Sequence, residues 1–408
     1  MIRITGADLV LPDRVAAGAS LTIDGDRIAE VASEDRPPAG GSDLTFTFDD
    51  HYLVPGFIDV HVHGVEGIDT LDGEQAIAAI AERMPRFGVT AFCPTSLACD
   101  PPTLRRMLAG VRVARTTRPP GGARVLPAHL ESNFINPEYK GAQPESCLRL
   151  PRPDSPRRSV AAAKGSAGEW TGADILAEIA AARPDVGIVT LAPELDGALD
   201  LIRDLVSHGH HVSLGHSAAT YDQAMEGIRA GARQATHLFN RMPPLGHRAP
   251  GLTGAVLESD DVVVELICDG VHVHPAMMRM ALAAKRPERV MAITDGTAGS
   301  GLPAGSTAAI GGYAISIRDA AYLADGTIAG SSLTMDRAFA KLTSEIGLSL
   351  SDAATVCATT PARALGLQGF GLIAPGAIAD LVVLDRDLRV VQTWIGGVLA
   401  WQRELRQP

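Results

Sequence analysis

The chain has 408 residues, and its 46% hydrophobic and 20% charged residues are typical of a globular protein with a large core and room for a second, smaller domain. A formal net charge of -11 at pH 7 leaves no general basic surface, so we expect no nucleic acid and no anionic membrane among its partners. No apolar run approaches the length of a membrane span, and the 5 cysteines lack CxxC spacing, which is typical of reduced thiols and indicates a cytoplasmic protein.

In chain order, the first 54 residues contain short alternating runs that predict strands over 2–9, 21–23 and 28–31. From Val54 onward, apolar runs alternate with Ala- and Leu-rich segments of helical character, which is the pattern of parallel βαβ units. The apolar runs predict strands over 57–63, 90–94, 125–131, 187–192, 211–216, 234–240, 262–269 and 290–295. The segments between them predict helices, for instance over 74–87, 102–115, 173–182, 195–206 and 221–231. Eight such strands make a closed (β/α)₈ barrel the most economical fold.

The rest of the chain predicts a hairpin over 312–329, a helix over 332–346 and short strands over 381–384 and 390–394. Both chain ends are rich in strands and neither is long enough for a stable domain, so we expect them to pair. The predicted organisation is α/β: a TIM-like (β/α)₈ barrel over 55–366, and a small β-sandwich domain built from 1–54 and 367–408.

The strongest chemical signal is the apolar run 55–64, which ends in His61 and His63. Alternate residues of a strand point to the same face, so both imidazoles would project toward one point, as metal ligands do. Two histidines on one strand face are also compatible with a solvated or hydrogen-bonded pair, so the downstream residues decide between these interpretations.

Functional side chains of such a barrel gather where its strands end. Seven ionisable residues fall at or just after predicted strand ends: His61, His63, Glu131, His216, His237, His272 and Asp295. Each one alone has a structural interpretation, such as a hydrogen-bonded core histidine or an N-cap aspartate. Together they favour a common site.

Imidazole and carboxylate suit a borderline cation such as Zn²⁺, and three protein ligands plus an open position describe a catalytic metal site. Glu131, His216 and His237 supply those three ligands, whereas His61 and His63 either hold a second ion or complete a shared site. Asp295 is then the proton carrier, acting as base for the attacking water and acid for the leaving amine. His272 is the candidate that orients a substrate carbonyl or a sugar hydroxyl.

These residues stand in motifs that resemble the amidohydrolase superfamily, specifically N-acetylglucosamine-6-phosphate deacetylases, over nearly the whole chain. The matching blocks are Pro-Gly-Phe-Ile-Asp-Val-His-Val-His-Gly (55–64), His-Leu-Glu (129–131), Asn-Pro-Glu (136–138), Lys-Gly-Ala (140–142), Leu-Ala-Pro-Glu (191–194), Gly-His-Ser (215–217), Thr-His-Leu-Phe-Asn (236–240), Asp-Gly-Val-His (269–272), Thr-Asp-Gly (294–296) and Gly-Ser-Ser-Leu-Thr-Met (330–335). The family fold is a barrel with a split small β-domain, as the pattern predicts.

The resemblance implies a role for each matching position. It implies a metal on Glu131, His216 and His237, a second ion at His61 and His63, and catalytic and substrate-orienting roles for Asp295 and His272. The segment 240–248 matches the phosphate-binding loop of the family, where Asn240 would bind phosphate and Arg248 would reach the neighbouring site of a homodimer. An arginine fork pairs well with phosphate, although a surface arginine in a solvated loop is the alternative interpretation.

Several positions depart from the family pattern. Ser132 and Asn133 follow Glu131 where Gly-Pro is usual, and Gln143 stands where a substrate-contacting histidine is expected. Arg241 replaces an alanine and adds positive charge beside the phosphate loop, so Gln143 and Arg241 are candidate substrate-binding residues. Val-Glu-Gly (65–67) replaces a glycine run, and the segment 133–170, with Arg149, Arg152, Arg157 and Arg158, is either a functional loop or a flexible insertion.

The leading hypothesis is metal-dependent removal of an N-acetyl group from an amino sugar, with N-acetylglucosamine 6-phosphate as substrate and one or two ions, most simply Zn²⁺. The same reaction on another N-acyl amino sugar or biosynthetic intermediate stays open. A cyclic-amide hydrolase is a weaker alternative, because many of those carry a carboxylated lysine on the fourth strand and residues 187–194 contain none. A catalytically inactive scaffold would have lost ligands, whereas every ligand position here is filled.

Overall fold

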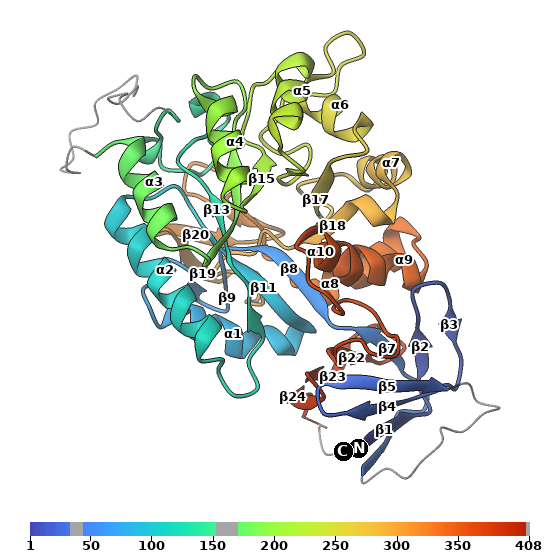
Figure 1. Ribbon diagram of the computed structural model, residues 1–408. Helices are drawn as coiled ribbons and strands as arrows, with labels where there is room; N and C mark the ends of the chain where they lie inside the picture. The colour runs from blue at the N-terminus through green and yellow to red at the C-terminus, as the bar shows by residue number, and fades with distance from the viewer. Residues whose placement is uncertain (33–43, 152–169, 405–408) are drawn as a thin grey trace.

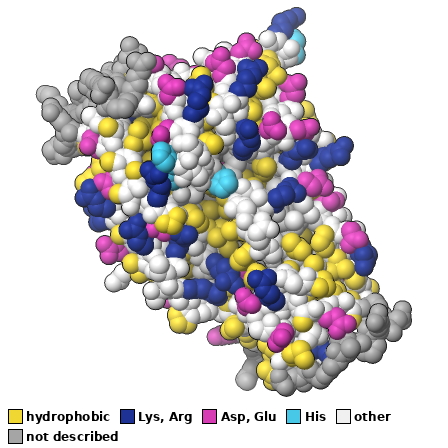
Figure 2. Space-filling model, in the orientation of Figure 1, with side chains coloured by type: hydrophobic (Ala, Val, Ile, Leu, Met, Phe, Trp, Pro, Cys, Tyr) yellow, Lys and Arg dark blue, Asp and Glu magenta, His cyan; other side chains and the backbone are white. Residues whose placement is uncertain are grey.

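The computed structural model describes residues 1–32, 44–151 and 170–404. Its larger part is a barrel of parallel strands surrounded by helices, and its smaller part is a β-domain at one side that contains the first and last strands (Figure 1). On the face shown in Figure 2, side chains of both charge signs are interspersed. No helix in these three described ranges has both the length and the apolar character needed to cross a membrane.

The barrel consists of eight parallel strands in chain order. They are β8 (Phe57–Val62), β11 (Val89–Ser96), β13 (Ala128–Glu131), β14 (Val186–Leu191), β15 (His211–Leu214), β16 (Gln234–Ala235), β17 (Val263–Ile267) and β18 (Val290–Ile293), with the short β12 (Arg124–Val125) also paired to β11. The ring is nearly closed, because a single bridge from Val62 to Gly296 and the Asp59–Thr294 hydrogen bond of 2.6 Å join β8 to the end of β18. The predicted α/β barrel is confirmed.

Helices cover the outside of this barrel (Figure 1). They are α1 (Ala76–Arg83), α2 (Pro101–Thr116), α3 (Gly172–Ala181), α4 (Ala198–Ser207), α5 (Tyr221–Ala230), α6 (Gly251–Glu258), α7 (Pro275–Lys285), α8 (Met335–Lys341), α9 (Leu350–Ala354) and α10 (Thr360–Ala364). Helix α2 shows why these segments form helices that pack on the barrel. Asp100 caps its first turn by accepting from the Thr103 N–H, and Leu104, Met107 and Val111 recur at helical spacing on its buried face.

The small domain is a sandwich of a four-stranded and a six-stranded sheet, which share a core that includes Leu9, Ile23 and Trp394. Its strands are β1 (Ile2–Thr5), β2 (Asp8–Val10), β3 (Val15–Ala16), β4 (Ser20–Asp24), β5 (Arg27–Ala32), β6 (Leu44–Thr47), β7 (Tyr52–Pro55), β22 (Leu381–Leu384), β23 (Val390–Ile395) and β24 (Val398–Gln402). Antiparallel pairing of β7 with β22 joins the two chain ends, which confirms a sheet domain built from both. The exact domain limits stay a prediction.

A third, small sheet follows the barrel and lies beside its mouth. It contains β19 (Thr307–Ile310), β20 (Tyr313–Ile317) and β21 (Ala321–Tyr322), so the predicted hairpin begins a few residues earlier than expected. Two more short strands, β9 (Gly64–Val65) and β10 (Ile68–Asp69), form a turn directly after β8. The β19–β21 sheet and the β9–β10 turn both follow carboxyl ends of barrel strands, and both help to form the mouth of the barrel.

Four predicted barrel strands are too long by two residues or more at their carboxyl ends. Those expected over 211–216, 234–240, 262–269 and 290–295 end at Leu214, Ala235, Ile267 and Ile293. For three of them the reason is backbone conformation: His216, His237 and Asp295 have φ of 47, 29 and 48°, in the left-handed region that extended strands exclude. The sequence pattern could not reveal this, because none of these residues is a glycine.

Candidate active site

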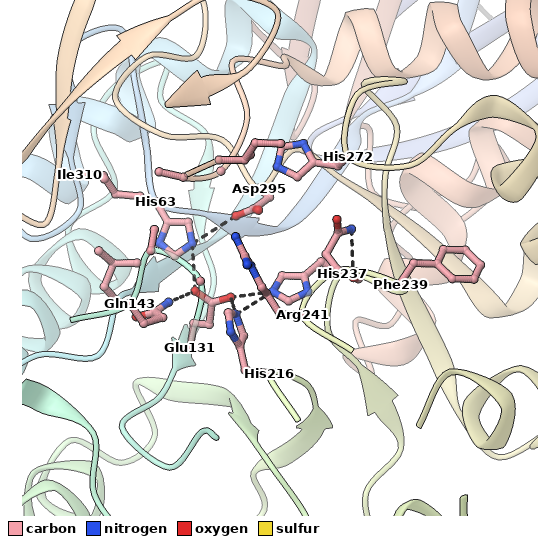
Figure 3. Close-up of a pocket in the computed structure, with 17 residues that line it drawn as sticks. His63, Glu131, Gln143, His216, His237, Phe239, Arg241, His272, Asp295 and Ile310 are labelled. Carbon is pink, nitrogen blue, oxygen red and sulfur yellow. Dashed lines mark hydrogen bonds and ion pairs between the residues drawn. The ribbon is translucent and has the colours of Figure 1, made fainter. Parts of the chain in front are cut away.

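A cavity of about 280 Å³ opens at the carboxyl ends of the barrel strands (Figure 3). Six of the seven predicted residues line it: His63, Glu131, His216, His237, His272 and Asp295. The seventh, His61, is completely buried directly beneath them. Below this level, apolar side chains such as Ile58, Cys93 and Ile188 fill much of the barrel.

The first group of converging ligand atoms consists of Glu131, His216 and His237, from the ends of β13, β15 and β16 (Figure 3). Glu131 Oε1 lies 2.8 Å from His216 Nε2 and 2.9 Å from His237 Nε2. The two Nε2 atoms are themselves 2.9 Å apart. The other nitrogen of His216, Nδ1, lies 2.8 Å from the Tyr139 carbonyl oxygen, which fixes the proton on Nδ1 and turns the Nε2 lone pair toward Glu131.

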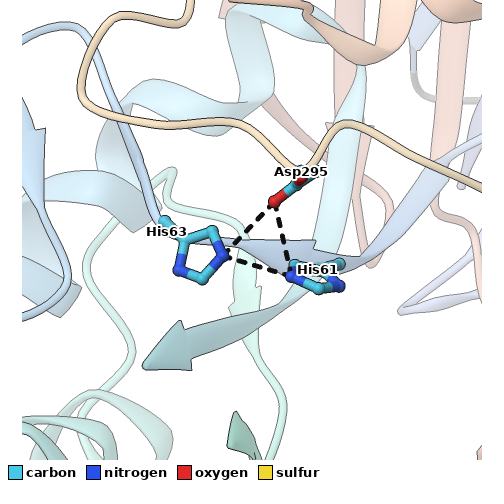
Figure 4. A group of neighbouring side chains, drawn as sticks. All are labelled: His61, His63 and Asp295. Atoms are coloured by element: carbon cyan, nitrogen blue, oxygen red, sulfur yellow. Dashed lines mark hydrogen bonds and ion pairs between the residues drawn. The ribbon is translucent and has the colours of Figure 1, made fainter. Parts of the chain in front are cut away.

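The second group consists of His61, His63 and Asp295 (Figure 4). Asp295 Oδ1 lies 3.4 Å from His61 Nε2 and 3.3 Å from His63 Nε2, and these two nitrogens are 3.2 Å apart. Glu131 lies between the groups, since its Oε1 is 3.8 Å from His61 Nε2 and its Oε2 is 3.6 Å from His63 Nε2. The two groups therefore form one continuous centre.

The electrostatics of this centre favour ionised carboxylates. Burial alone would raise the pKa of Glu131, but the facing imidazoles of His216 and His237 hold it well below its usual value. Burial also opposes ionisation of Asp295, and the neighbouring His61 and His63 nevertheless lower its pKa. Burial disfavours a proton on His237, yet Glu131 raises its pKa to about 9. The site thus attracts positive charge.

The donor set fits a bound divalent cation better than a hydrogen-bond network. Each facing pair of Nε2 atoms can share only one proton, so lone pairs of nitrogen and carboxylate oxygen are left pointing at one another. In addition, Nδ1 of His63 and Nδ1 of His237 are buried and have no hydrogen-bond partner among the described residues. Imidazole and carboxylate at this spacing are the ligands of a borderline cation, and the arrangement has room for two.

The left-handed backbone at His216, His237 and Asp295 belongs to this site. Non-glycine residues in that region carry strain, which clusters where side chains must be aimed at a common point. In each case the chain leaves its strand and turns, so that the side chain points into the cavity rather than along the barrel wall.

Gln143 lies in the cavity wall and is buried. Its side-chain oxygen accepts a 2.8 Å hydrogen bond from the Ala98 N–H, which directs its amide nitrogen toward Glu131 Oε2, to which it donates. The neighbouring departures are structural: Ser132 donates to the Thr190 carbonyl at 2.5 Å, and Asn133 donates to the Cys99 and Cys147 carbonyls. Of these three departures, Gln143 is the one whose side chain contacts a predicted metal ligand.

The phosphate-loop candidates lie differently from one another. Arg241 and Asn240 line the cavity, and Arg241 crosses close to Gly141, where an added Cβ would lie 2.6 Å from Arg241 Nε. His272 lines the cavity as well, with its Nδ1 2.6 Å from Asp269 Oδ2. Arg248 is exposed and is absent from the described residues that line this cavity. Its expected role in a neighbouring subunit stays a prediction.

The arginine-rich segment after Gln143 is described only in part. Arg149 is buried, donates to the Ser146 carbonyl at 2.8 Å and stacks 3.4 Å over the Trp170 ring, so it holds the loop together. Arg152, Arg157 and Arg158 lie outside the described residues. Glu66 pairs with Arg86 on the outer side of the barrel.

Sequence reasoning missed the carboxylates beneath the site. Glu265 on β17 and Asp59 on β8 are completely buried, and burial raises the pKa of each to about 7. Glu265 Oε2 lies 2.9 Å from His61 Nδ1. The available signal was an acidic residue in the otherwise apolar run 262–268, since a lone charge in a barrel strand requires a partner.

Comparisons with known proteins agree with this geometry. A model of the amidohydrolase family matches residues 52–400. The N-acetylgalactosamine-6-phosphate deacetylase of Escherichia coli O157:H7 is 35% identical over 354 residues, covering 86% of this chain and 88% of the relative. The N-acetylglucosamine-6-phosphate deacetylase of Bacillus subtilis is 31% identical over 398 residues, covering 96% and 95%.

A solved variant of the N-acetyl-D-glucosamine-6-phosphate deacetylase from Mycobacterium smegmatis, in complex with N-acetyl-D-glucosamine-6-phosphate, superposes with a TM-score of 0.86 at 32% identity, covering 98% of this chain and 99% of that one. Fold and site together define an amidohydrolase. More closely, the chain belongs to the N-acetylglucosamine-6-phosphate deacetylase family.

Proposed function

We propose that this protein hydrolyses the N-acetyl group of N-acetylglucosamine 6-phosphate to give glucosamine 6-phosphate and acetate. The observation that carries the proposal is the pair of converging ligand groups around Glu131, with Asp295 at their edge and an open cavity above them. Relatives named for this activity cover nearly the whole chain. The family resemblance and the site geometry therefore support the same reaction.

Glu131, His216 and His237 would hold one divalent ion, and His61, His63 and Asp295 would hold a second. Zn²⁺ suits these ligands best. Such ions acidify a bound water and polarise the amide carbonyl of the substrate. The chain supplies the rest of the chemistry: it moves protons, orients the sugar and binds the phosphate.

Asp295 is the group that moves the proton. Its carboxylate is ionised before reaction, because His61 and His63 lower its pKa, and its Oδ1 lies at the cavity edge. It accepts a proton from the attacking water and then donates it to the leaving amine, so that the product leaves as a neutral amine.

His272 orients the substrate. Asp269 Oδ2 engages the ring Nδ1 at 2.6 Å, and Asp269 Oδ1 accepts the backbone N–H of His272 at 2.9 Å, so one carboxylate fixes both the ring and the turn that carries it. Its Nε2 is thereby presented to the cavity for a sugar hydroxyl or the acetyl carbonyl. Asn240 and Arg241 would bind the phosphate, and Arg248 would reach the site of a partner in a homodimer.

A second candidate is the same reaction on the galacto epimer, since one relative at 35% identity is an N-acetylgalactosamine-6-phosphate deacetylase. The test is steady-state deacetylation by metal-loaded protein on three substrates: the two epimeric 6-phosphates and unphosphorylated N-acetylglucosamine. A preference for N-acetylglucosamine 6-phosphate by orders of magnitude in kcat/KM supports the proposal. Preference for the galacto epimer selects the second candidate, and weak turnover indifferent to phosphate contradicts both.

A further inference from the structure

Glu265 is a buried carboxylate that the proposed reaction does not use. It lies on β17, points into the barrel and is completely buried. Removing a carboxylate from water is costly unless hydrogen bonds compensate it. Its Oε2 lies 2.9 Å from His61 Nδ1 and accepts the backbone N–H of His237 at 3.3 Å. Glu265 thus touches one residue of each ligand group.

The contact with His61 determines which nitrogen of that ring faces the metal centre. A neutral imidazole has one N–H donor and one lone pair. When Nδ1 donates to Glu265, the lone pair is on Nε2, the atom that lies 3.4 Å from Asp295 Oδ1 and 3.2 Å from His63 Nε2. A carboxylate behind a metal-bound histidine fixes the ring orientation and increases its basicity.

The contact with His237 supports the other group. His237 is buried and has a φ of 29°, and a buried backbone N–H needs an acceptor. Glu265 Oε2 accepts this N–H and also contacts His61 Nδ1. One oxygen therefore links the turn after β16 to the histidine of β8.

Glu265 also lies near His129, and the trio of His61, His129 and Glu265 has metal-ligand spacing. However, His129 has no free nitrogen: Nδ1 is 2.9 Å from the Val60 carbonyl oxygen and Nε2 is 2.8 Å from Thr190 Oγ1. A third metal site is therefore disfavoured, and Glu265 remains as a partner of imidazole and backbone.

We propose that Glu265 is a positioning residue that holds His61 in the tautomer and orientation needed for the ion at His61, His63 and Asp295. This inference rests on the proposed metal centre and deepens it. The capacity of the protein for the second ion then depends on a side chain that never touches the ion or the substrate.

The test is metal binding by Glu265→Leu and Glu265→Gln, measured as ions per chain by elemental analysis and as Zn²⁺ affinity by chelator competition. We expect Glu265→Leu to retain the first ion and to lose about 10- to 100-fold in affinity for the second. Glu265→Gln keeps a hydrogen-bond acceptor of the same size, so we expect a smaller loss. If Glu265→Leu does not fold, the metal affinity of Glu265→Gln tests the proposal in its place.

A second readout follows the tautomer directly. In ¹⁵N-histidine NMR spectra of the metal-free protein, we expect His61 to show a protonated Nδ1, assigned by its disappearance in His61→Asn, and Glu265→Leu to shift it. Asp380→Asn removes another buried carboxylate, which stands just before β22 and pairs with Arg124 of β12, and it controls for a general loss of stability.

The outcomes separate this inference from the proposed function. Wild-type protein that binds no ion overturns the proposed function. Wild-type protein that binds ions, together with Glu265 variants of unchanged ion content, affinity and His61 spectrum, overturns only the role of Glu265. Equal losses in Asp380→Asn also overturn it, since the effect would then be one of stability.

Discussion

Histidines gather at both ends of the barrel, and only one gathering resembles an active site. The second lies around a cavity of about 350 Å³ at the amino ends of the strands, lined by His208, His210, His211, Arg115 and Arg183 among others. Strand β15 connects the two ends directly, since His211 begins it and His216 follows it.

The difference lies in the partners of the rings. At the amino end, His210 Nδ1 is 3.0 Å from the Val186 carbonyl oxygen, and His208 Nδ1 is 2.9 Å from the backbone carbonyl oxygen of Asp204 and 3.5 Å from its exposed carboxylate. These rings therefore bond to nearby backbone and do not converge on a shared carboxylate. None of the described residues lining that cavity is a carboxylate. At the carboxyl end, Glu131 and Asp295 draw the imidazoles of different strands to common points. A candidate active site arises where imidazoles and carboxylates from several strand ends converge on common points, and not simply where histidines are numerous.

The largest effect that would break this comparison is loss of the proton carrier. We expect Asp295→Asn to lower kcat by about 10³-fold, because an amide cannot take up the proton of the attacking water. The measurement is steady-state deacetylation at saturating substrate. Ion content should be determined alongside, and a variant that loses an ion would show that Asp295 acts mainly as a ligand. A nearly unchanged kcat would contradict the role given to Asp295.

Arg241 sharpens the comparison on the substrate side, since it lines the catalytic cavity from the left-handed turn after β16. We expect Arg241→Met to lower kcat/KM for the 6-phosphate by about 10- to 100-fold, which corresponds to losing a charged hydrogen bond. Turnover of unphosphorylated sugar should stay unchanged. Arg279→Met on α7 is the matched control, because that arginine is exposed, does not line the cavity and donates to the Glu345 carbonyl at 3.2 Å. Equal losses on both substrates would place Arg241 outside phosphate recognition.

The sequence could predict which side chains come together, because strand order in a parallel barrel places every strand end at one rim. The fold and the grouping of Glu131, His216 and His237 follow from that rule. It could not predict that Gln143 bonds to Glu131 or that Glu265 bonds to His61, because those partners are 12 and 204 positions apart and meet only through tertiary packing. The early strand ends were equally hidden, because left-handed non-glycine residues leave no mark in an apolar pattern.

His129 lies in the barrel interior between the two ends, and its effect on stability can be measured by the pH dependence of unfolding. Burial lowers the pKa of His129 to about 4 from its model-peptide value of 6.5. As the pH falls below 6.5, the unfolded chain takes up a proton that the folded state refuses, so this group removes stability progressively down to pH 4. We expect about 2 kcal/mol of the decrease in unfolding free energy between pH 7 and pH 5 to come from it. Guanidinium unfolding of metal-free wild-type protein and His129→Asn measures this, and equal decreases in both proteins would contradict it.

The smallest effect belongs to His211 at the amino end of β15. Its side chain is half-buried and burial lowers its pKa, so it is a neutral ring, and no carboxylate among the described residues shifts it. We expect His211→Asn to leave kcat/KM within about twofold and the unfolding free energy within about 0.5 kcal/mol, the range of substitutions that remove no structural feature. His216→Asn, five residues further along the chain and at the opposite end of β15, is the counterpart measured in parallel and should lose the first ion. If His211→Asn instead lowered ion content or kcat, the amino-end cavity would be coupled to the catalytic rim, and the contrast between the two ends would fail.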